Sequence, residues 1–197
     1  GYRSGAEWAH ELTRSILSNF WPAIHFGQLV FKVGDTEISR ATYERLVAQY
    51  AGSEGFTAHL YSAAVASQPI IASVPSVGLC ELYLATGNVD FPKRLCMVRG
   101  SGMRIYDHAP RACRVPFTGL FRCVDEEGNK LLRQLEPPRH DAWEPGRIEG
   151  SAGRRALDAI KGWIREEVKK LNPFYAGRSF NETELAKYLP EDADNDA

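Results

Sequence analysis

Apolar side chains recur at three- and four-residue intervals along the first fifty residues, and this spacing predicts amphipathic helices. The first helix is expected over residues 8–21, where Pro22 and Gly27 supply the signals that end it. Ser39 is a favourable N-cap for a second helix, which is expected over residues 40–49. The expected buried side of this second helix consists of Tyr43, Leu46, Val47 and Tyr50.

The same helical spacing returns near the end of the chain. It runs over residues 156–171, with Trp163 and Ile164 in the middle of the apolar stripe, and Pro173 is expected to stop this helix. A short last helix is predicted over residues 181–189, because an asparagine there is followed three positions later by a glutamate. The apolar face of the long helix is suited to packing across a sheet.

Between these helices the chain shows alternating or short apolar runs bounded by glycine and proline, which are typical of strands. Arg99–Gly102 contains two glycines and predicts a hairpin-like connection. Pro116 places the start of one strand at an edge or a bulge. A turn is expected at residues 126–129, and residues 56–66 fit a helix or a strand equally well. The expected strands cover residues 28–33, 77–85, 95–98, 103–106 and 114–124.

This order of elements predicts a single α+β domain over residues 1–190. We expect a mostly antiparallel or mixed sheet, with an N-terminal helix and a long C-terminal helix packed on it. Residues 191–197 are acidic and are expected to form a disordered tail. The sequence starts at Gly1 and both methionines are internal, so we expect the domain to be a fragment of a larger protein.

The composition is that of a globular protein in a reducing compartment. Apolar residues make up 44% and charged residues 25% of the chain, and no run of about 20 apolar residues could span a membrane. The four cysteines form no C-x-x-C pair, which disfavours a zinc site. Cys80, Cys96 and Cys123 lie in apolar runs, where a free thiol behaves as a small hydrophobe. We therefore expect buried free thiols and a cytoplasmic protein without membrane contact.

The densest group of chemically useful side chains lies in residues 133–147, RQLEPPRHDAWEPGR. Glu136, His140 and Asp141 are weak candidates there for acid–base chemistry or for holding a divalent metal. The structural alternative is that the His–Asp pair pins a proline-rich segment over the sheet, anchored by Trp143. The sequence contains no phosphate-binding glycine loop and no G-x-S-x-G motif. We assign no catalytic residue and no metal, and a metal-dependent hydrolase around His140 and Asp141 remains an alternative.

Positive charge is concentrated in one part of the chain. Residues 91–170 carry 17 basic and 11 acidic side chains, although the net charge of the whole chain is −1. Within residues 91–123 the only acid is Asp107. Such a surface suits either the phosphates of a nucleic acid or the acids of a neighbouring domain. The basic residues of this segment are Lys93, Arg94, Arg99, Arg104, Arg111, Arg114 and Arg122.

Four segments resemble the region that follows the ATPase domain in large bacterial ATP-binding proteins of the GHKL type (gyrase, heat-shock chaperone, histidine kinase and MutL-like). The resemblance extends over most of the chain, from about residue 20 to 189. The segments are FWPAI-x₂-G-x-L-x-F-x-V at residues 20–33, MVRGSGMRI at 97–105, F-x-G-x-F at 117–121 and GNKLLRQLEPPRHDAWEPGR at 128–147.

The resemblance implies a non-catalytic, transducer-like or C-terminal domain that couples the nucleotide state of a GHKL-type ATPase to a partner. Many such proteins are associated with defence against phage. The ATP-site motifs of the group, an acidic-plus-asparagine helix and a D-x-G-x-G loop, are missing from this sequence. No cofactor is therefore expected here, and ATP and Mg²⁺ belong to the expected parent. The expected partners are the ATPase domain of the same parent chain, DNA, and a second copy in a homodimer formed through the parent.

Overall fold

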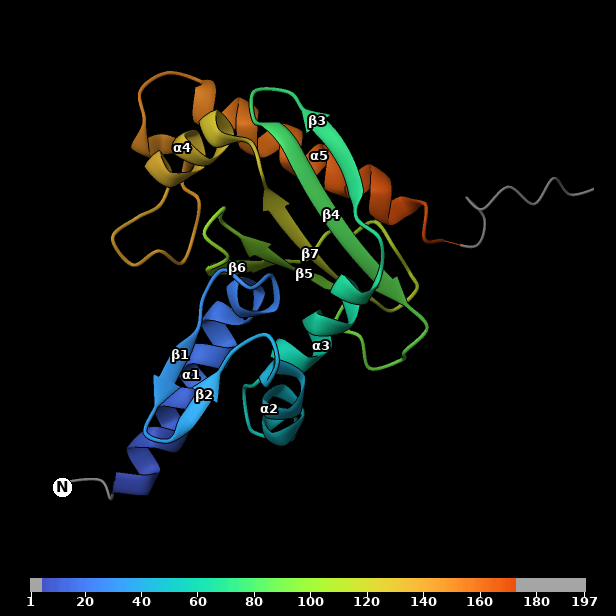
Figure 1. Cartoon of the computed structure of the whole chain (residues 1–197). Coiled ribbons are helices and arrows are strands. Elements are labelled where there is room, and N and C mark those ends of the chain that lie inside the picture. The colour runs from blue at the N-terminus through green and yellow to red at the C-terminus, as the bar shows by residue number, and fades with distance from the viewer. Residues whose placement is uncertain (1–4, 173–197) are drawn as a thin grey trace, which may run out of the picture.

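A five-stranded mixed sheet lies at the centre of the protein, whose structure is a computed structural model that describes residues 5–172, with side chains from residue 7 (Figure 1). Its strand order is β3-β4-β7-β5-β6. Neighbouring strands are antiparallel except β5 and β7, which are parallel. The α+β class is confirmed, and of the two sheets expected from the sequence, mostly antiparallel or mixed, the mixed one is found. The strands are β3 (Ile70–Val74), β4 (Gly78–Thr86), β5 (Arg94–Val98), β6 (Arg104–His108) and β7 (Phe117–Cys123).

Helical layers cover both faces of this sheet (Figure 1). One layer holds α1 (Gly5–His25), the hairpin β1 (Phe31–Val33) and β2 (Thr36–Ile38), α2 (Tyr43–Tyr50), α3 (Ala58–Ser62) and a 3₁₀ helix (Ala63–Ala66). The other layer holds α4 (Glu126–Gln134), a 3₁₀ helix (Pro145–Arg147) and α5 (Ala152–Lys169). The segment at 56–66 is therefore helical.

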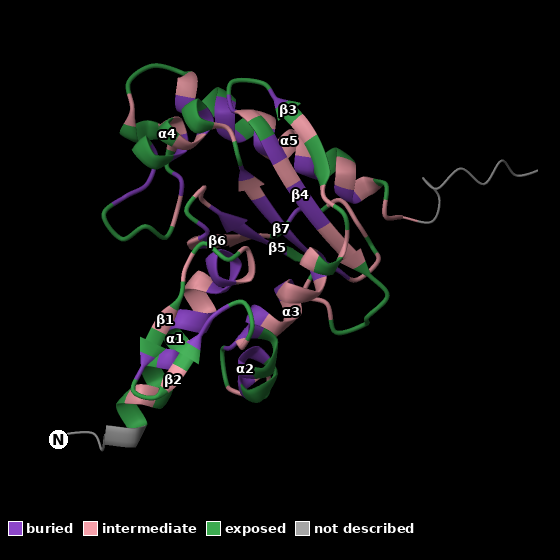
Figure 2. Ribbon diagram, viewed as in Figure 1, coloured by how far each residue is buried: buried purple, intermediate pink, exposed green. Residues whose placement is uncertain are grey.

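The alternation of side chains along the strands divides the core into two clusters. Buried positions lie on the central strands and on the helices (Figure 2). In β7, Leu120 packs with the helices of the first layer, whereas Phe117 and Phe121 pack with α5 on the opposite face. Ile164 of α5 is fully buried there, and Trp163 beside it is partly buried with its ring edge against Phe121. The long helix thus packs on the sheet, as its apolar stripe predicts.

Pro22 does not end the first helix, contrary to expectation. The helix continues through Pro22 to His25 and closes where Gly27 takes a φ of +71°. A proline inside a helix removes one backbone hydrogen bond and costs about 3 kcal/mol. Burial offsets this cost, because Trp21, Ala23 and Ile24 around the proline are all fully buried. The lost hydrogen bond is thus tolerated by a well-packed turn.

The second helix starts later than its sequence predicts. It begins at Tyr43 instead of residue 40, and Ser39 does not cap it: the buried Oγ of Ser39 has no hydrogen-bond partner among the described residues. Thr42 Oγ1 instead accepts a hydrogen bond from the Ser39 amide at 2.9 Å and donates to the Glu37 carbonyl oxygen at 2.8 Å. This local bonding holds residues 39–42 in a turn. The predicted buried side of the helix is confirmed.

The expected turn at residues 126–129 is the first part of α4. Asp125 caps this helix, because its Oδ1 accepts a hydrogen bond from the amide of Gly128 at 2.9 Å. The edge strand β3 was not expected at all. The helix predicted at 181–189, the position of Pro173 and the acidic tail at 191–197 lie outside the described residues.

We expect the stability of this fold to depend on pH through three histidines. Burial lowers the pKa of His25, His59 and His108 below the ordinary value of 6.5. As the pH falls through about 6.5, these histidines take up protons in the unfolded chain before they do so in the folded chain. The free energy of unfolding is therefore highest above that pH and decreases as the pH falls. We expect urea unfolding to give a lower free energy of unfolding at pH 5.5 than at pH 7.5. His59→Gln should reduce this difference, because it removes one of the three histidines. If the unmodified protein is equally stable or more stable at pH 5.5, the prediction is wrong.

Candidate functional site

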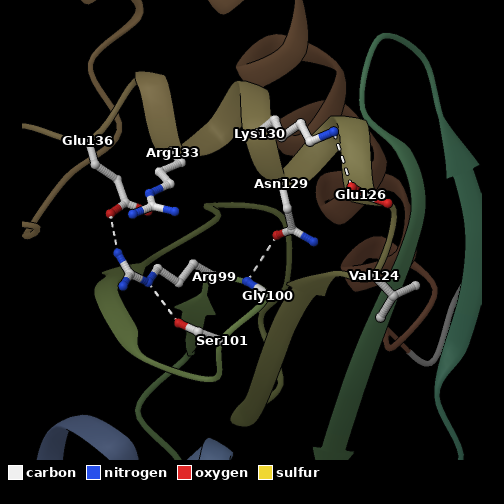
Figure 3. Close-up of a pocket in the computed structure, with 9 residues that line it drawn as sticks. All are labelled: Arg99, Gly100, Ser101, Val124, Glu126, Asn129, Lys130, Arg133 and Glu136. Atoms are coloured by element: carbon white, nitrogen blue, oxygen red, sulfur yellow. Dashed lines mark hydrogen bonds and ion pairs between the residues drawn. The ribbon is translucent and has the colours of Figure 1, made fainter.

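A pocket of about 450 Å³ opens between the β5–β6 loop and α4 (Figure 3). The loop supplies one wall, α4 supplies the opposite wall, and the segment that follows α4 closes one side. Its volume falls in the range of small-molecule sites. The lining residues are Arg99, Gly100, Ser101, Val124, Glu126, Asn129, Lys130, Arg133 and Glu136.

A buried carboxylate organises this pocket. The side chain of Glu136 is only 1% exposed, and its Oε2 accepts a hydrogen bond from Arg99 Nη1 at 2.8 Å. The same oxygen lies 2.9 Å from His140 Nδ1. Arg99 also donates from Nε to Ser101 Oγ at 2.8 Å, as Figure 3 shows. Glu136 therefore fixes the direction in which Arg99 leaves the loop.

Asn129 ties the same loop to α4 through its side-chain amide. Its Oδ1 accepts a hydrogen bond from the Gly100 amide at 2.9 Å, and its Nδ2 donates to the carbonyl oxygens of Cys123 at 3.0 Å and Asp125 at 2.8 Å. A Cβ on Gly100 would lie 2.6 Å from the Asn129 amide, so glycine allows this approach. The loop, the end of β7 and α4 are thus joined at one side chain.

Two further cations line the pocket from α4. Lys130 Nζ lies 3.1 Å from Glu126 and 2.7 Å from Glu127, and the hydrogen bond to Glu127 raises the pKa of Lys130 above its usual value. Arg133 is exposed, and no acid among the described residues lies within ion-pair distance of its guanidinium. Arg133 is therefore free to meet an anion that enters the pocket.

The structure brings together two of the three residues that the sequence suggested for acid–base or metal chemistry. Glu136 and His140 are in contact, and the backbone of His140 takes a φ of +52° in the turn that follows Glu136. Asp141 is exposed and makes no side-chain hydrogen bond among the described residues. Within that same part of the chain, no group of three or more His, Cys, Asp or Glu side chains could hold a metal ion.

The seven basic residues of segment 91–123 do not share one solvent face. Three of them are ion-paired inside the chain: Arg99 with Glu136, Arg104 with Asp107 at 3.0 Å, and Arg122 with Glu81 at 2.6 Å. The other four are exposed: Lys93, Arg94, Arg111 and Arg114.

The two internal pairs on the α1 side of the sheet are held by aromatic residues. Tyr61 donates its hydroxyl to Asp107 at 2.6 Å, and the guanidinium of Arg122 lies 3.8 Å from the ring centre of Phe26. Arg104 and Arg122 are thus fixed by partners within the chain, and their role here is structural.

Sequence reasoning missed Asn129, Lys130 and Arg133, because residues 126–129 were expected to form a turn. The available signal was the helix-start pattern, an aspartate at position 125 followed by two glutamates. With that helix recognised, Asn129 and Arg133 fall four residues apart on one of its faces. All three residues therefore line the pocket because they lie on α4.

The state of the cysteines agrees with the expectation of buried free thiols. All four cysteines are free, and Cys80, Cys96 and Cys123 are buried. None of the helices described in residues 5–172 has the length and hydropathy needed to cross a membrane.

Comparison with known proteins gives no relative: no protein-family model, no curated protein and no solved structure matches this chain.

Proposed function

We propose that this chain is a non-catalytic, transducer-like domain of a GHKL-type ATP-binding protein, and that the pocket beside α4 is its working site. One observation carries the proposal. The segments 97–105 and 128–147, which are two of the four that resemble GHKL-associated regions, form the opposite walls of that pocket.

The pocket is built to transmit a displacement between the sheet and α4. Arg99 is joined to Glu136 after α4, and Gly100 is joined to Asn129 within α4. A contact that moves the loop therefore pulls on α4 at Asn129 and on the segment that follows α4 at Glu136. Such a linkage supports the proposal that this domain couples the nucleotide state of the ATPase domain to a partner.

The exposed cations fit a neighbouring domain of the same parent chain. Lys93 Nζ donates to the carbonyl oxygen of Arg114 at 2.7 Å, so these two residues lie together, and Arg94 and Arg111 are exposed nearby in the sequence. We propose that acidic side chains of the ATPase domain meet this surface. The parent would be a cytoplasmic protein, in keeping with the free thiols, with a role in phage defence and the option of forming a homodimer.

The assignment is tested by titrating the chain with ATP and Mg²⁺ in a calorimeter. We expect no micromolar binding, because the nucleotide site lies in the ATPase domain of the parent. Tight stoichiometric binding of ATP would contradict the assignment. Reading the gene upstream of Gly1 is the second arm: a D-x-G-x-G motif there supports the proposal, and an unrelated upstream sequence overturns it.

A nucleic-acid-binding role is the second candidate, and the four exposed cations are the observation that favours it. If all four contacted phosphates, a log–log plot of affinity against salt would have a slope of roughly −3 to −4. Three of the seven basic residues are held by acids of this chain, so we expect no measurable binding of duplex DNA even at about 50 mM salt. A salt-dependent complex that weakens uniformly in Arg111→Ala and Arg114→Ala would favour DNA instead.

A further inference from the structure

We propose that the pocket between the Arg99–Gly102 loop and α4 binds a phosphate group that still carries a proton, as a phosphomonoester of a small molecule does. The inference concerns the ligand of the pocket, and it stands independently of the coupling role proposed above. It rests on one buried acceptor without a donor and on two arginines that face the same space.

The acceptor is the second carboxylate oxygen of Glu136. Oε2 already has Arg99 and His140 within hydrogen-bond distance, whereas the buried Oε1 has no partner among the described residues. The great majority of buried polar atoms in folded proteins are hydrogen-bonded. A carboxylate can only accept, so a ligand that bonds to Oε1 must bring a hydrogen-bond donor, and the groups that cover this buried oxygen must move aside to admit it.

The guanidinium groups of Arg99 and Arg133 favour a ligand that is also an anion. Arg133 has no acidic partner among the described residues, and Arg99 uses Nε and Nη1 but donates from Nη2 to no group in residues 5–172. Figure 3 shows both guanidinium groups on the side of the pocket where Glu136 lies. Arginine binds phosphate oxygens through paired N–H groups. Lys130 adds no net positive charge at the α4 wall, because Glu126 and Glu127 both pair with it.

Few anions satisfy both conditions. Sulfate and simple carboxylates carry no proton at neutral pH and would set an oxygen against Glu136 Oε1. A phosphomonoester has a second pKa of about 6, so near that pH it offers one P–O–H donor together with negatively charged oxygens. The cavity of about 450 Å³ is also much larger than a phosphate ion, which leaves room for the group that the phosphate is attached to.

The direct test compares three probes at pH 6.5 and equal ionic strength: inorganic phosphate, glycerol phosphate and sulfate. We expect calorimetry to show at least tenfold tighter binding of the phosphates than of sulfate. The melting temperature should rise with the phosphates only, since a ligand of the folded state stabilises it by mass action. Tighter binding of glycerol phosphate than of inorganic phosphate identifies an ester ligand, and the reverse order identifies the free ion.

Two variants assign the contacts. Arg133→Ala should weaken phosphate binding at least tenfold, whereas Arg139→Ala, an exposed arginine that does not line the pocket, should leave it unchanged. Glu136→Gln should bring the ratio of phosphate to sulfate affinity close to one, because an amide can donate to sulfate. Equal binding of sulfate and phosphate by the unmodified protein, no binding of either phosphate, or equal effects of the two arginine variants would overturn the proposal. If Glu136→Gln does not fold, the anion comparison and the arginine pair still decide it.

Discussion

Replacing Gly128 with alanine should destabilise the protein by about 3 kcal/mol, which corresponds to a fall of roughly 6–12 °C in melting temperature. A Cβ at this position would lie 1.8 Å from the Val77 carbonyl oxygen and 2.8 Å from Cys123 Sγ. Both neighbours are held by the sheet, because Val77 leads into β4 and Cys123 ends β7. The first turn of α4 would have to move away from the sheet to admit the methyl group. Differential scanning calorimetry measures the change.

Gly162 provides the matched control, since it also lies inside a helix. A Cβ built there meets nothing within 4 Å, so Gly162→Ala in α5 should raise the stability by about 0.5–1 kcal/mol through helix propensity alone. The two substitutions are chemically identical and are expected to act in opposite directions. If both stabilise the protein, the close packing of α4 against the start of β4 is wrong.

The helices and central strands were predictable because their periodicity is long and regular. The apolar stripe of α5 repeats over five turns, and the residues of β4 and β7 alternate between two buried faces. The edge strand β3 was missed, because it has only five residues between two prolines and its Ile70 and Ile71 are exposed. The residues of β3 therefore do not alternate between apolar and polar, which is the pattern that identifies a half-buried strand.

The parallel pairing of β5 with β7 could not be read from the sequence. Between these strands the chain forms β6 and the loop at 109–116, and the return of β7 beside β5 depends on contacts between residues far apart. The pattern of apolar residues indicates which residues are buried, but not which strands lie side by side. The sequence therefore predicted a mostly antiparallel or mixed sheet, and the folded chain forms the mixed one.

The candidate site was half predictable, for a similar reason. Glu136 and His140 stand out because they lie close together in an unusual segment, and they are indeed in contact. Their partner Arg99 is 37 positions away in the sequence. Nothing in the alternation of the strands distinguishes Arg99 from Arg104 or Arg122, which also find acidic partners within the chain. Only the folded sheet brings the β5–β6 loop over Glu136.

Glu136→Ala should lower the free energy of unfolding by about 3 kcal/mol, the lower end of the cost of removing one partner from a buried ion pair. Glu136 is the buried partner, with its side chain 1% exposed, whereas Arg99 is 26% exposed and can recover some hydration. The loss should appear as a lower denaturation midpoint in urea with an unchanged slope, because the same fold is being unfolded.

Glu126→Ala is the control for this prediction, because it removes a carboxylate that lines the same pocket but is 83% exposed. Its ion pair with Lys130 lies on the surface, so the change should stay within about 0.5 kcal/mol. The double variant Arg99→Met/Glu136→Leu should recover part of the loss, because it leaves no unpaired charge. If Glu136→Ala is as mild as Glu126→Ala, the Arg99–Glu136 pair does not hold the loop to the segment after α4. The route by which the pocket would transmit a displacement would then be reduced to the contact between Gly100 and Asn129.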